Sequence, residues 1–219
     1  MKITDTIFQI GGDGCTSPQD AAVYLIRNGD LGAIVDAGCG DHTDILIENI
    51  KALGVQPADI QYLLLTHCHY DHTGGAARIR EITGCRIVAH SQDAVFLETG
   101  NNEVTAARWY GRTMEPFTVD RKLIREMETL YLGDQAVQAI HIPGHSPGSV
   151  AYTTWSNGLK ILFGQDVHGP LDPRLLSNRS DYTASLEKLL QEEADILCEG
   201  HYGIYRGKEA VARFIQSFL

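Results

Sequence analysis

Three imidazoles and one carboxylate fall within six consecutive positions of this chain, in the run His67-Cys68-His69-Tyr70-Asp71-His72. The run follows the apolar stretch 62–65, so we expect it at the end of a strand. Imidazole nitrogen and carboxylate oxygen are the ligands that divalent zinc prefers, and they also suit iron or manganese. Since neighbouring side chains point in different directions, four donors in so short a segment cannot all bind one ion. The spacing therefore predicts two adjacent metal ions.

Three further potential ligands each follow a stretch with strand character. His145 lies between proline and glycine residues that force a loop, Asp166 comes soon after the apolar run ending at Phe163, and His201 follows Cys198-Glu199-Gly200. Layered α/β proteins present their chemistry on such loops at strand ends. We therefore expect all seven donors to meet at one edge of the fold.

The elements that position these donors are short β-rich runs, turns and amphipathic helices. Gly, Asn and Asp turns between the first runs predict antiparallel hairpins, and Thr43 is a candidate helix cap. Strands are expected at 7–10, 21–26, 33–36, 60–65, 86–89, 130–132, 136–142, 149–154, 160–163 and 196–198, and helices at 41–53, 74–82, 91–97, 183–192 and 208–218. Two β-rich blocks flanked by helices predict two stacked sheets with helices outside. At 219 residues we expect one domain, 1–219.

The segment 100–126 is the least regular part of the chain. It combines Trp109, Tyr110 and Phe117 with several charged residues. We expect it to shape the pocket, as long irregular insertions often form lids. A homodimer contact and a surface helix with its aromatic face on the core are the alternatives.

Composition narrows the class of partner. The formal net charge is −10, with 18 Lys and Arg against 28 Asp and Glu, which argues against a nucleic-acid partner because phosphate binding needs clustered positive charge. No apolar run is long enough for a membrane span, and the polar N-terminus does not resemble a secretory signal. The five cysteines form no Cys-x-x-Cys pair and fit reduced thiols. We expect a cytoplasmic protein that acts on a small molecule.

The pattern His-x-His-x-Asp-His, followed by His, Asp and His, resembles that of the metallo-β-lactamase-fold hydrolases over essentially the whole chain. The resemblance implies an αββα four-layer sandwich, an α/β fold. It also implies a ligand set in which His67, His69 and His145 hold one metal, Asp71, His72 and His201 hold the second, and Asp166 bridges them.

The mechanism expected from this ligand set is attack of a metal-bound hydroxide on a small acyl substrate, a thioester or a lactone. Two divalent ions, zinc before iron or manganese, lower the pKa of a shared water toward neutrality. Asp71 is placed to orient the hydroxide and to carry its proton. A carboxylate at Asp166 resembles glyoxalase-II-like thioesterases and homoserine lactonases and disfavours a β-lactamase. The candidate substrate contacts are Tyr70, His168, Trp109 and Tyr110, whereas supporting or surface roles are expected for His42, His90 and His141.

Two other classes remain open at this stage. The chain also resembles persulfide dioxygenases, which would hold one iron through His67, His145 and Asp166. A metal-binding protein without turnover is the other. Metal content separates these classes, since about two zinc ions per chain favour the hydrolase and about one iron favours the dioxygenase.

Overall fold

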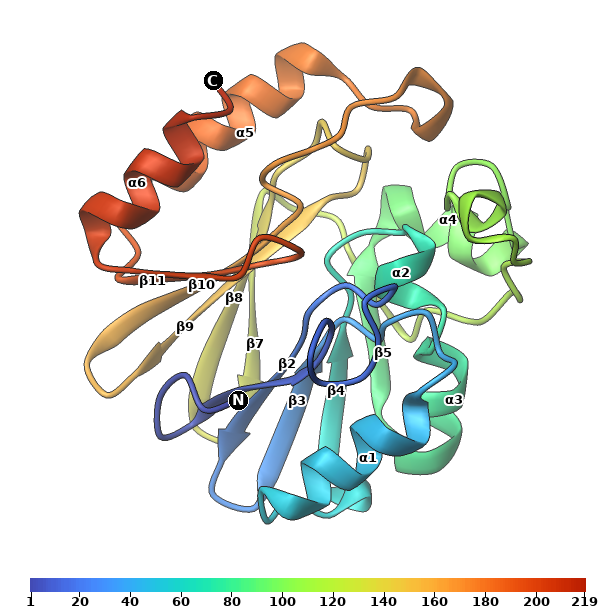
Figure 1. Cartoon of the computed structure of the whole chain (residues 1–219), viewed down its shortest axis with the longest axis vertical. Helices are drawn as coiled ribbons and strands as arrows, with labels where there is room; N and C mark the ends of the chain where they lie inside the picture. The colour runs from blue at the N-terminus through green and yellow to red at the C-terminus, as the bar shows by residue number, and fades with distance from the viewer.

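Two six-stranded sheets pack face to face in the computed structural model, which describes residues 1–219 (Figure 1). The first sheet contains, in order, β1 (Ile7–Gly11), β2 (Val23–Asn28), β3 (Leu31–Val35), β4 (Ile60–Leu64), β5 (Arg86–His90) and β6 (Arg121–Leu123). The second contains β12 (Ile204–Arg206), β11 (Ile196–Glu199), β10 (Leu159–Gln165), β9 (Val150–Ser156), β8 (Gln135–His141) and β7 (Met127–Leu132).

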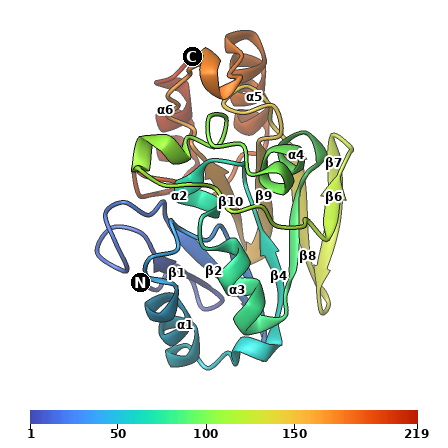
Figure 2. The same ribbon diagram turned by 90° about the vertical axis from the view of Figure 1, so that its right-hand side faces the viewer.

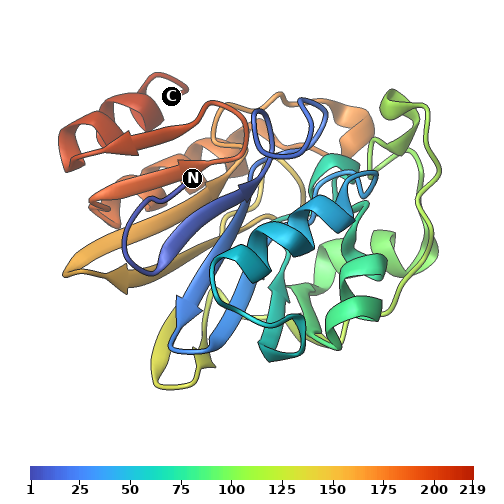
Figure 3. The ribbon, with the colours of Figure 1, turned by 60° about the horizontal axis from the view of Figure 1, so that its bottom comes forward.

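Helices cover the outer face of each sheet. The helices are α1 (Thr43–Ala52), α2 (Tyr70–Thr73), α3 (Ala76–Thr83), α4 (Ser91–Thr99), α5 (Arg179–Gln191) and α6 (Lys208–Gln216), with 3₁₀ turns η1 (Pro57–Asp59), η2 (Ala107–Tyr110) and η3 (Pro173–Leu175). Figure 2 shows α3 and α4 lying across the strands of the first sheet. Figure 3 shows α1 on that face and α6 at the opposite side of the molecule. None of these helices is long and apolar enough to cross a bilayer.

Three layers of buried apolar side chains hold the sandwich together. In β2, Val23 and Leu25 pack toward the helices, whereas Tyr24 and Ile26 pack between the two sheets. This alternation follows from the two-residue period of a strand. A third layer joins the second sheet to α5 and α6 through residues such as Leu186. The αββα arrangement expected from the sequence is confirmed.

Strand pairing agrees only in part with the expected hairpins. β2 and β3 form the antiparallel hairpin expected at Asn28-Gly29-Asp30. β1 and β2 are also antiparallel, but the long loop 12–22 joins them in place of a tight turn. From β3 to β6 the strands are parallel, so their carboxyl ends share one edge of the sheet. That edge carries the run His67 to His72.

Element ends differ from the expected ones where local capping decides them. Thr43 does not cap α1 but is its first residue, and its hydroxyl donates to the Gly40 carbonyl over 2.9 Å. Helix α5 starts four residues earlier than expected, at Arg179 rather than 183, because the Asn178 side chain accepts from the Asp181 amide at 3.1 Å. β6, β12 and the single turn α2 were not expected.

The segment 100–126 forms no surface helix beyond the single turn η2. Phe117 is only 6% exposed and packs with the core between the first sheet and its helices. Phe117 therefore takes no part in shaping the pocket over the histidines, whereas Trp109 and Tyr110 are placed differently, as described below.

Candidate metal centre

The first half of the site is held by the segment after β4. Thr66 is fixed by two neighbours, since its amide donates to Asp36 Oδ1 at 2.8 Å and its carbonyl accepts from the Val150 amide at 2.7 Å. His67 lies in the bend that follows, His69 has extended backbone, and the turn α2 then presents Asp71 and His72. All four side chains are buried.

The second half comes from three connections of the other sheet. His145 lies in the loop between β8 and β9, Asp166 directly follows β10, and His201 lies in the turn after β11. Gly200 makes close approach possible here, because a Cβ at this position would collide with Asp166 Oδ1. The structure thus brings all seven sequence-predicted donors to one place.

Four of the donors form a tight group. His69 Nδ1 lies 2.9 Å from His67 Nε2 and 3.0 Å from His145 Nε2, and His145 Nε2 lies 3.3 Å from Asp166 Oδ2. Ligands of one tetrahedral zinc ion lie about 3.3 Å apart, given bonds of about 2.0–2.1 Å. The spacing of these atoms therefore fits a single divalent ion.

The other three donors form a second group beside the first. His201 Nε2 lies 3.1 Å from Asp71 Oδ2, and His72 Nε2 lies 3.1 Å from the Oδ1 atom of Asp166. The two oxygens of Asp166 therefore face different groups, Oδ2 toward His145 and Oδ1 toward His72 and His201. A carboxylate in this position can be shared by two cations.

Unsatisfied buried atoms test whether cations fit this site. His72 Nε2 and Asp166 Oδ1 are buried without a hydrogen-bond partner, which is costly unless another group binds them. The outer nitrogens of two rings are engaged, since His72 Nδ1 lies 2.7 Å from Asp36 Oδ2 and His145 Nδ1 lies 2.9 Å from the Pro170 carbonyl. With a proton on each Nδ1, the lone pair of each Nε2 points into the site, as a metal ligand requires. The donor set therefore fits divalent metal ions.

The electrostatics of the two groups differ. Burial, followed by the neighbouring imidazoles, lowers the pKa of His67 and lowers that of His69 to about 3, so both rings are neutral at pH 7. Burial opposes charge on His201 as well, but the nearby carboxylates of Asp166 and Asp71 raise its pKa to about 10. For His72, burial is likewise outweighed by the surrounding carboxylates, led by Asp166, which raise its pKa. The half of the site around the carboxylates thus attracts positive charge.

Three buried carboxylates that support the site were missed from the sequence. Asp36, after β3, accepts from the Thr66 amide and hydroxyl and from His72. Asp93, in the first turn of α4, accepts from the Cys68 amide at 2.8 Å. It also accepts from the Ser146 hydroxyl at 2.6 Å and the Gly148 amide at 2.7 Å.

Glu199 is the third. It accepts from the amides of His201 and Tyr202 at 2.6 and 2.7 Å, and its Oε1 lies 2.7 Å from His168 Nδ1. The only local signals for these carboxylates are a strand end, a helix start and the position before Gly200, and such positions commonly carry Asp or Glu.

A cavity of about 260 Å³ opens above the donors. Its lining combines His69, Asp71, His145, Asp166, His168 and His201 with an apolar wall of Ala106, Trp109, Tyr110, Pro170 and Leu175. Trp109, Tyr110 and His168, three of the four candidate substrate contacts, thus line this cavity. His90 and His141 stack on each other, with ring centroids 3.8 Å apart, and do not line this cavity.

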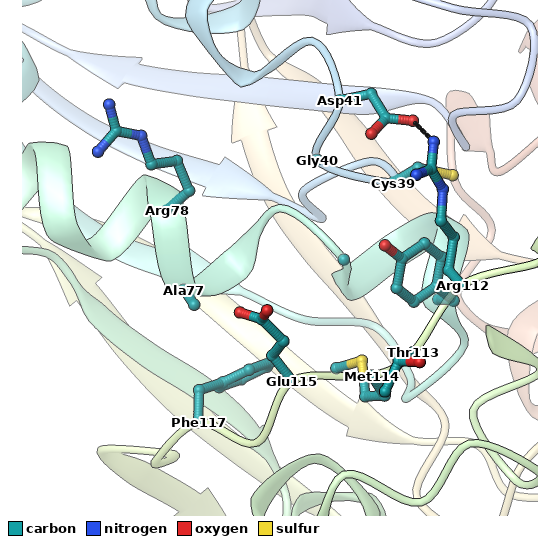
Figure 4. Close-up of a pocket in the computed structure, with 12 residues that line it drawn as sticks. Cys39, Gly40, Asp41, Ala77, Arg78, Arg112, Thr113, Met114, Glu115 and Phe117 are labelled. Carbon is teal, nitrogen blue, oxygen red and sulfur yellow. Dashed lines mark hydrogen bonds and ion pairs between the residues drawn. The ribbon is translucent and has the colours of Figure 1, made fainter.

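Tyr70 lines a different cavity, shown in Figure 4. Its ring packs against Tyr110, with centroids 5.9 Å apart, and faces away from the donors toward a space of about 460 Å³. That second cavity contains an ion pair of 2.6 Å between Arg112 and Asp41, and Phe117 also lies on its wall. Tyr70 is therefore not placed to touch a molecule bound over the histidines.

The chain is similar in sequence to several known proteins. A family model described as the metallo-beta-lactamase superfamily matches residues 17–201. The chain is 29% identical over 226 residues to acyl-coenzyme A thioesterase MBLAC2 of Gallus gallus, covering 91% of this chain and 78% of that protein. It is 30% identical over 179 residues to hydroxyacylglutathione hydrolase GloC of Haemophilus influenzae, covering 79% and 80% of the two chains.

Solved structures share the fold at lower sequence identity. A metallo-beta-lactamase mutant from Cronobacter sakazakii superposes with a TM-score of 0.82 at 21% identity, covering 100% of this chain and 92% of that one. The metallo-beta-lactamase MIM-1 from Novosphingobium pentaromativorans gives a TM-score of 0.81 at 22% identity, covering 99% and 85%. These similarities show that the fold is shared.

Proposed function

Because the chain belongs to the metallo-beta-lactamase superfamily and gathers seven donors under one cavity, we propose that it hydrolyses small thioesters with two divalent metal ions. The observation that carries the proposal is the position of Asp166. Its two oxygens face two separate donor groups, an arrangement that suits two cations sharing one carboxylate. A single iron held by three of these residues would leave the group of Asp71, His72 and His201 without a role.

In this proposal His67, His69 and His145 would hold one ion, Asp71, His72 and His201 would hold the other, and Asp166 would be available to both. Zinc is the favoured metal, and iron or manganese would suit the same ligands. When bound, such ions make a water acidic enough to act as a nucleophile at pH 7 and stabilise negative charge on a carbonyl oxygen.

The protein's own residues orient the reaction. Asp71 Oδ2 lines the cavity beside His201, so it can accept the proton of the attacking water and pass it to the departing sulfur. The wall of Trp109, Tyr110 and Leu175 can exclude water from the acyl group. Water adds to the thioester carbonyl, the carbon–sulfur bond breaks, and the products are a carboxylic acid and a thiol.

The thioester is favoured over other acyl groups by the relatives. Both MBLAC2 and GloC are named for thioester substrates, and both match most of this chain. The test is metal analysis of protein purified without chelator, followed by assays with thioester, lactone and phosphoester panels. We expect about two zinc ions per chain and thioester turnover. Lactone cleavage alone, or one iron with oxygen uptake, would contradict the proposal.

Asp71→Asn tests the proton-transfer role. The amide keeps the shape and one potential ligand oxygen but cannot take up a proton. We expect most of the metal to remain bound while kcat falls about 10²- to 10⁴-fold, the usual contribution of a general base. Asp44→Asn, an exposed change on α1, is the matched control. Full turnover by metal-loaded Asp71→Asn would remove this role.

A further inference from the structure

No Lys or Arg lines the 260 Å³ cavity of the proposed thioester site, although the common biological thiol carriers are anions. The chain as a whole carries a formal net charge of −10. Any recognition of an anionic carrier must therefore come from residues at the mouth of the cavity.

Trp109 and Arg174 meet at that mouth. Trp109, from η2, lines the cavity and is 51% exposed, so part of the indole faces solvent. The Arg174 guanidinium, from η3, lies 5.5 Å from the centroid of the indole ring. One partner comes from the segment after α4 and the other from the loop after β10. The pair thus bridges the two halves of the molecule beside the donors.

Arg174 is oriented in advance by Asp172. Its Nε lies 3.1 Å from Asp172 Oδ1 and its Nη2 lies 2.6 Å from Asp172 Oδ2, while Nη1 makes no hydrogen bond within the chain. The Arg174 side chain is 63% exposed. A guanidinium that is held on one side and open on the other suits phosphate oxygens, which Arg can bind through paired N–H groups.

The two neighbouring cavities offer a poorer path for an anionic tail. The cavity beyond His201, of about 480 Å³, is lined by Asp13 and Asp20 and by no Lys or Arg. Its negative charge opposes phosphate and carboxylate groups.

The cavity in Figure 4 is no better. It pairs Arg78 and Arg112 with Asp41 and Glu115, so its charges balance. The packed rings of Tyr70 and Tyr110 also stand between it and the donors. The route across Trp109 leads instead to Arg174, whose Nη1 makes no hydrogen bond within the chain beside the ion pair with Asp172.

We propose that the thiol half of the substrate is coenzyme A, its pantetheine arm lying on the exposed indole of Trp109 and its phosphates at Arg174. This inference rests on the proposed thioester hydrolysis and adds the carrier. The diphosphate supplies the charge that Arg174 recognises, whereas the methyl and methylene groups of the flexible arm can pack on the indole.

The experiment compares three thioesters of the same acyl group on the metal-loaded full chain. These are butyryl-CoA, butyryl-pantetheine, which lacks the phosphates, and butyryl-N-acetylcysteamine, which has the shortest arm. For Arg174→Ala we expect kcat/KM on butyryl-CoA to fall about five- to tenfold, mainly through KM, as suits one exposed charged contact. The other two substrates should be unaffected, and Arg174→Lys should recover part of the loss. Trp109→Ala should lower kcat/KM for both butyryl-CoA and butyryl-pantetheine.

Two further variants and a salt series complete the design. Arg213→Ala, on the outer helix α6 and 72% exposed, should change nothing. Arg112→Ala tests the neighbouring cavity, and a CoA-specific loss there rather than in Arg174→Ala would overturn the placement. Added salt should raise the KM of the wild type for butyryl-CoA more than that of Arg174→Ala, because screening weakens the phosphate contact.

The outcomes separate the two proposals. If all three thioesters are cleaved but Arg174→Ala affects them equally or not at all, the CoA inference fails and the thioesterase stands. If S-lactoylglutathione is cleaved far faster than butyryl-CoA, the carrier is wrong. If metal-loaded protein cleaves no thioester, both proposals fail.

Discussion

Asp36 shows how one buried carboxylate can set the chemistry of a ligand. It lies directly after β3, and it accepts from His72 Nδ1 at 2.7 Å and from the Thr66 hydroxyl at 2.8 Å. The contact with His72 fixes the proton on Nδ1 and leaves Nε2 free for a cation. The contacts with Thr66 fix the start of the segment that carries His67. Asp36 therefore orients two parts of the donor set without being a donor itself.

Asp36→Asn should weaken metal binding more than it weakens folding. The amide can present its NH₂ to a ring nitrogen or to the Thr66 amide, but it cannot accept from all three donors. We expect the metal affinity to fall about 10- to 100-fold, the usual effect of losing such a supporting contact. Competition with a chromophoric chelator measures this affinity, and Asp44→Asn serves as the control. An unchanged affinity would show that His72 is oriented by something else.

The metal-ligating donors could be predicted from the sequence, whereas the carboxylates that support them could not. Few structural roles require three histidines in six positions, so the run from His67 to His72 is informative by itself. Asp36, Asp93 and Glu199 stand at positions where an exposed carboxylate is ordinary. Their role depends on which backbone amides the tertiary fold brings within 3 Å, and spacing along the chain contains no such information.

At the scale of elements, α4 joins the two loops that carry the three histidines of the first donor group. Its residue Asp93 is fully buried and accepts from Cys68, between His67 and His69, and from Ser146 and Gly148, beside His145. Gly148 is needed for this approach, since a Cβ there would lie 2.7 Å from the Asp93 carboxyl carbon. One carboxylate thus holds loops that belong to different sheets.

Asp93→Asn should loosen both loops together. The amide loses one acceptor and directs N–H groups at backbone donors, leaving at least one buried donor unsatisfied, which costs roughly 1–3 kcal/mol. We expect a lower free energy of unfolding in urea for metal-free protein, and weaker binding of the first metal ion. Ser146→Ala, which removes a single hydrogen bond, should have a smaller effect, and Gln92→Ala, exposed in the same turn, should have none. Equal stability of Asp93→Asn and wild type would contradict this role.

Elements with strong periodicity were predicted more reliably than those defined by tertiary contacts. β4, α1 and α6 lie close to their expected ranges because the apolar pattern is local. β6 and β12 have three residues each, and they form only because a neighbouring strand is already present to pair with. The turn α2 was hidden for a different reason, since Asp71 and His72 were interpreted as ligands and Tyr70 as a substrate contact, with no helix expected there.

At the scale of the whole molecule, both sheets are needed to assemble the seven donors. The first sheet and the turn after it supply His67, His69, Asp71 and His72, and the second supplies His145, Asp166 and His201. The sequence resemblance to the superfamily is confirmed by the family match and by the shared fold. What the chain order could not reveal is the register of one sheet on the other, because that register depends on how the buried faces of β2, β4, β9 and β10 interlock.

Since the proposed metal ions join donors from both sheets, their removal should destabilise the whole fold. Ions that bind only the folded chain add stability of about 4 kcal/mol when free metal is near a thousand times its dissociation constant. We expect EDTA to lower the urea midpoint and added zinc to restore it, while the slope of the transition stays constant because the same surface is exposed. In His201→Ala, zinc bound by the first donor group should still raise the urea midpoint, but by less than in the wild type. An identical midpoint in EDTA and in zinc would show that the donors do not bind the ion in the folded state, and would remove the basis for a metal-dependent reaction.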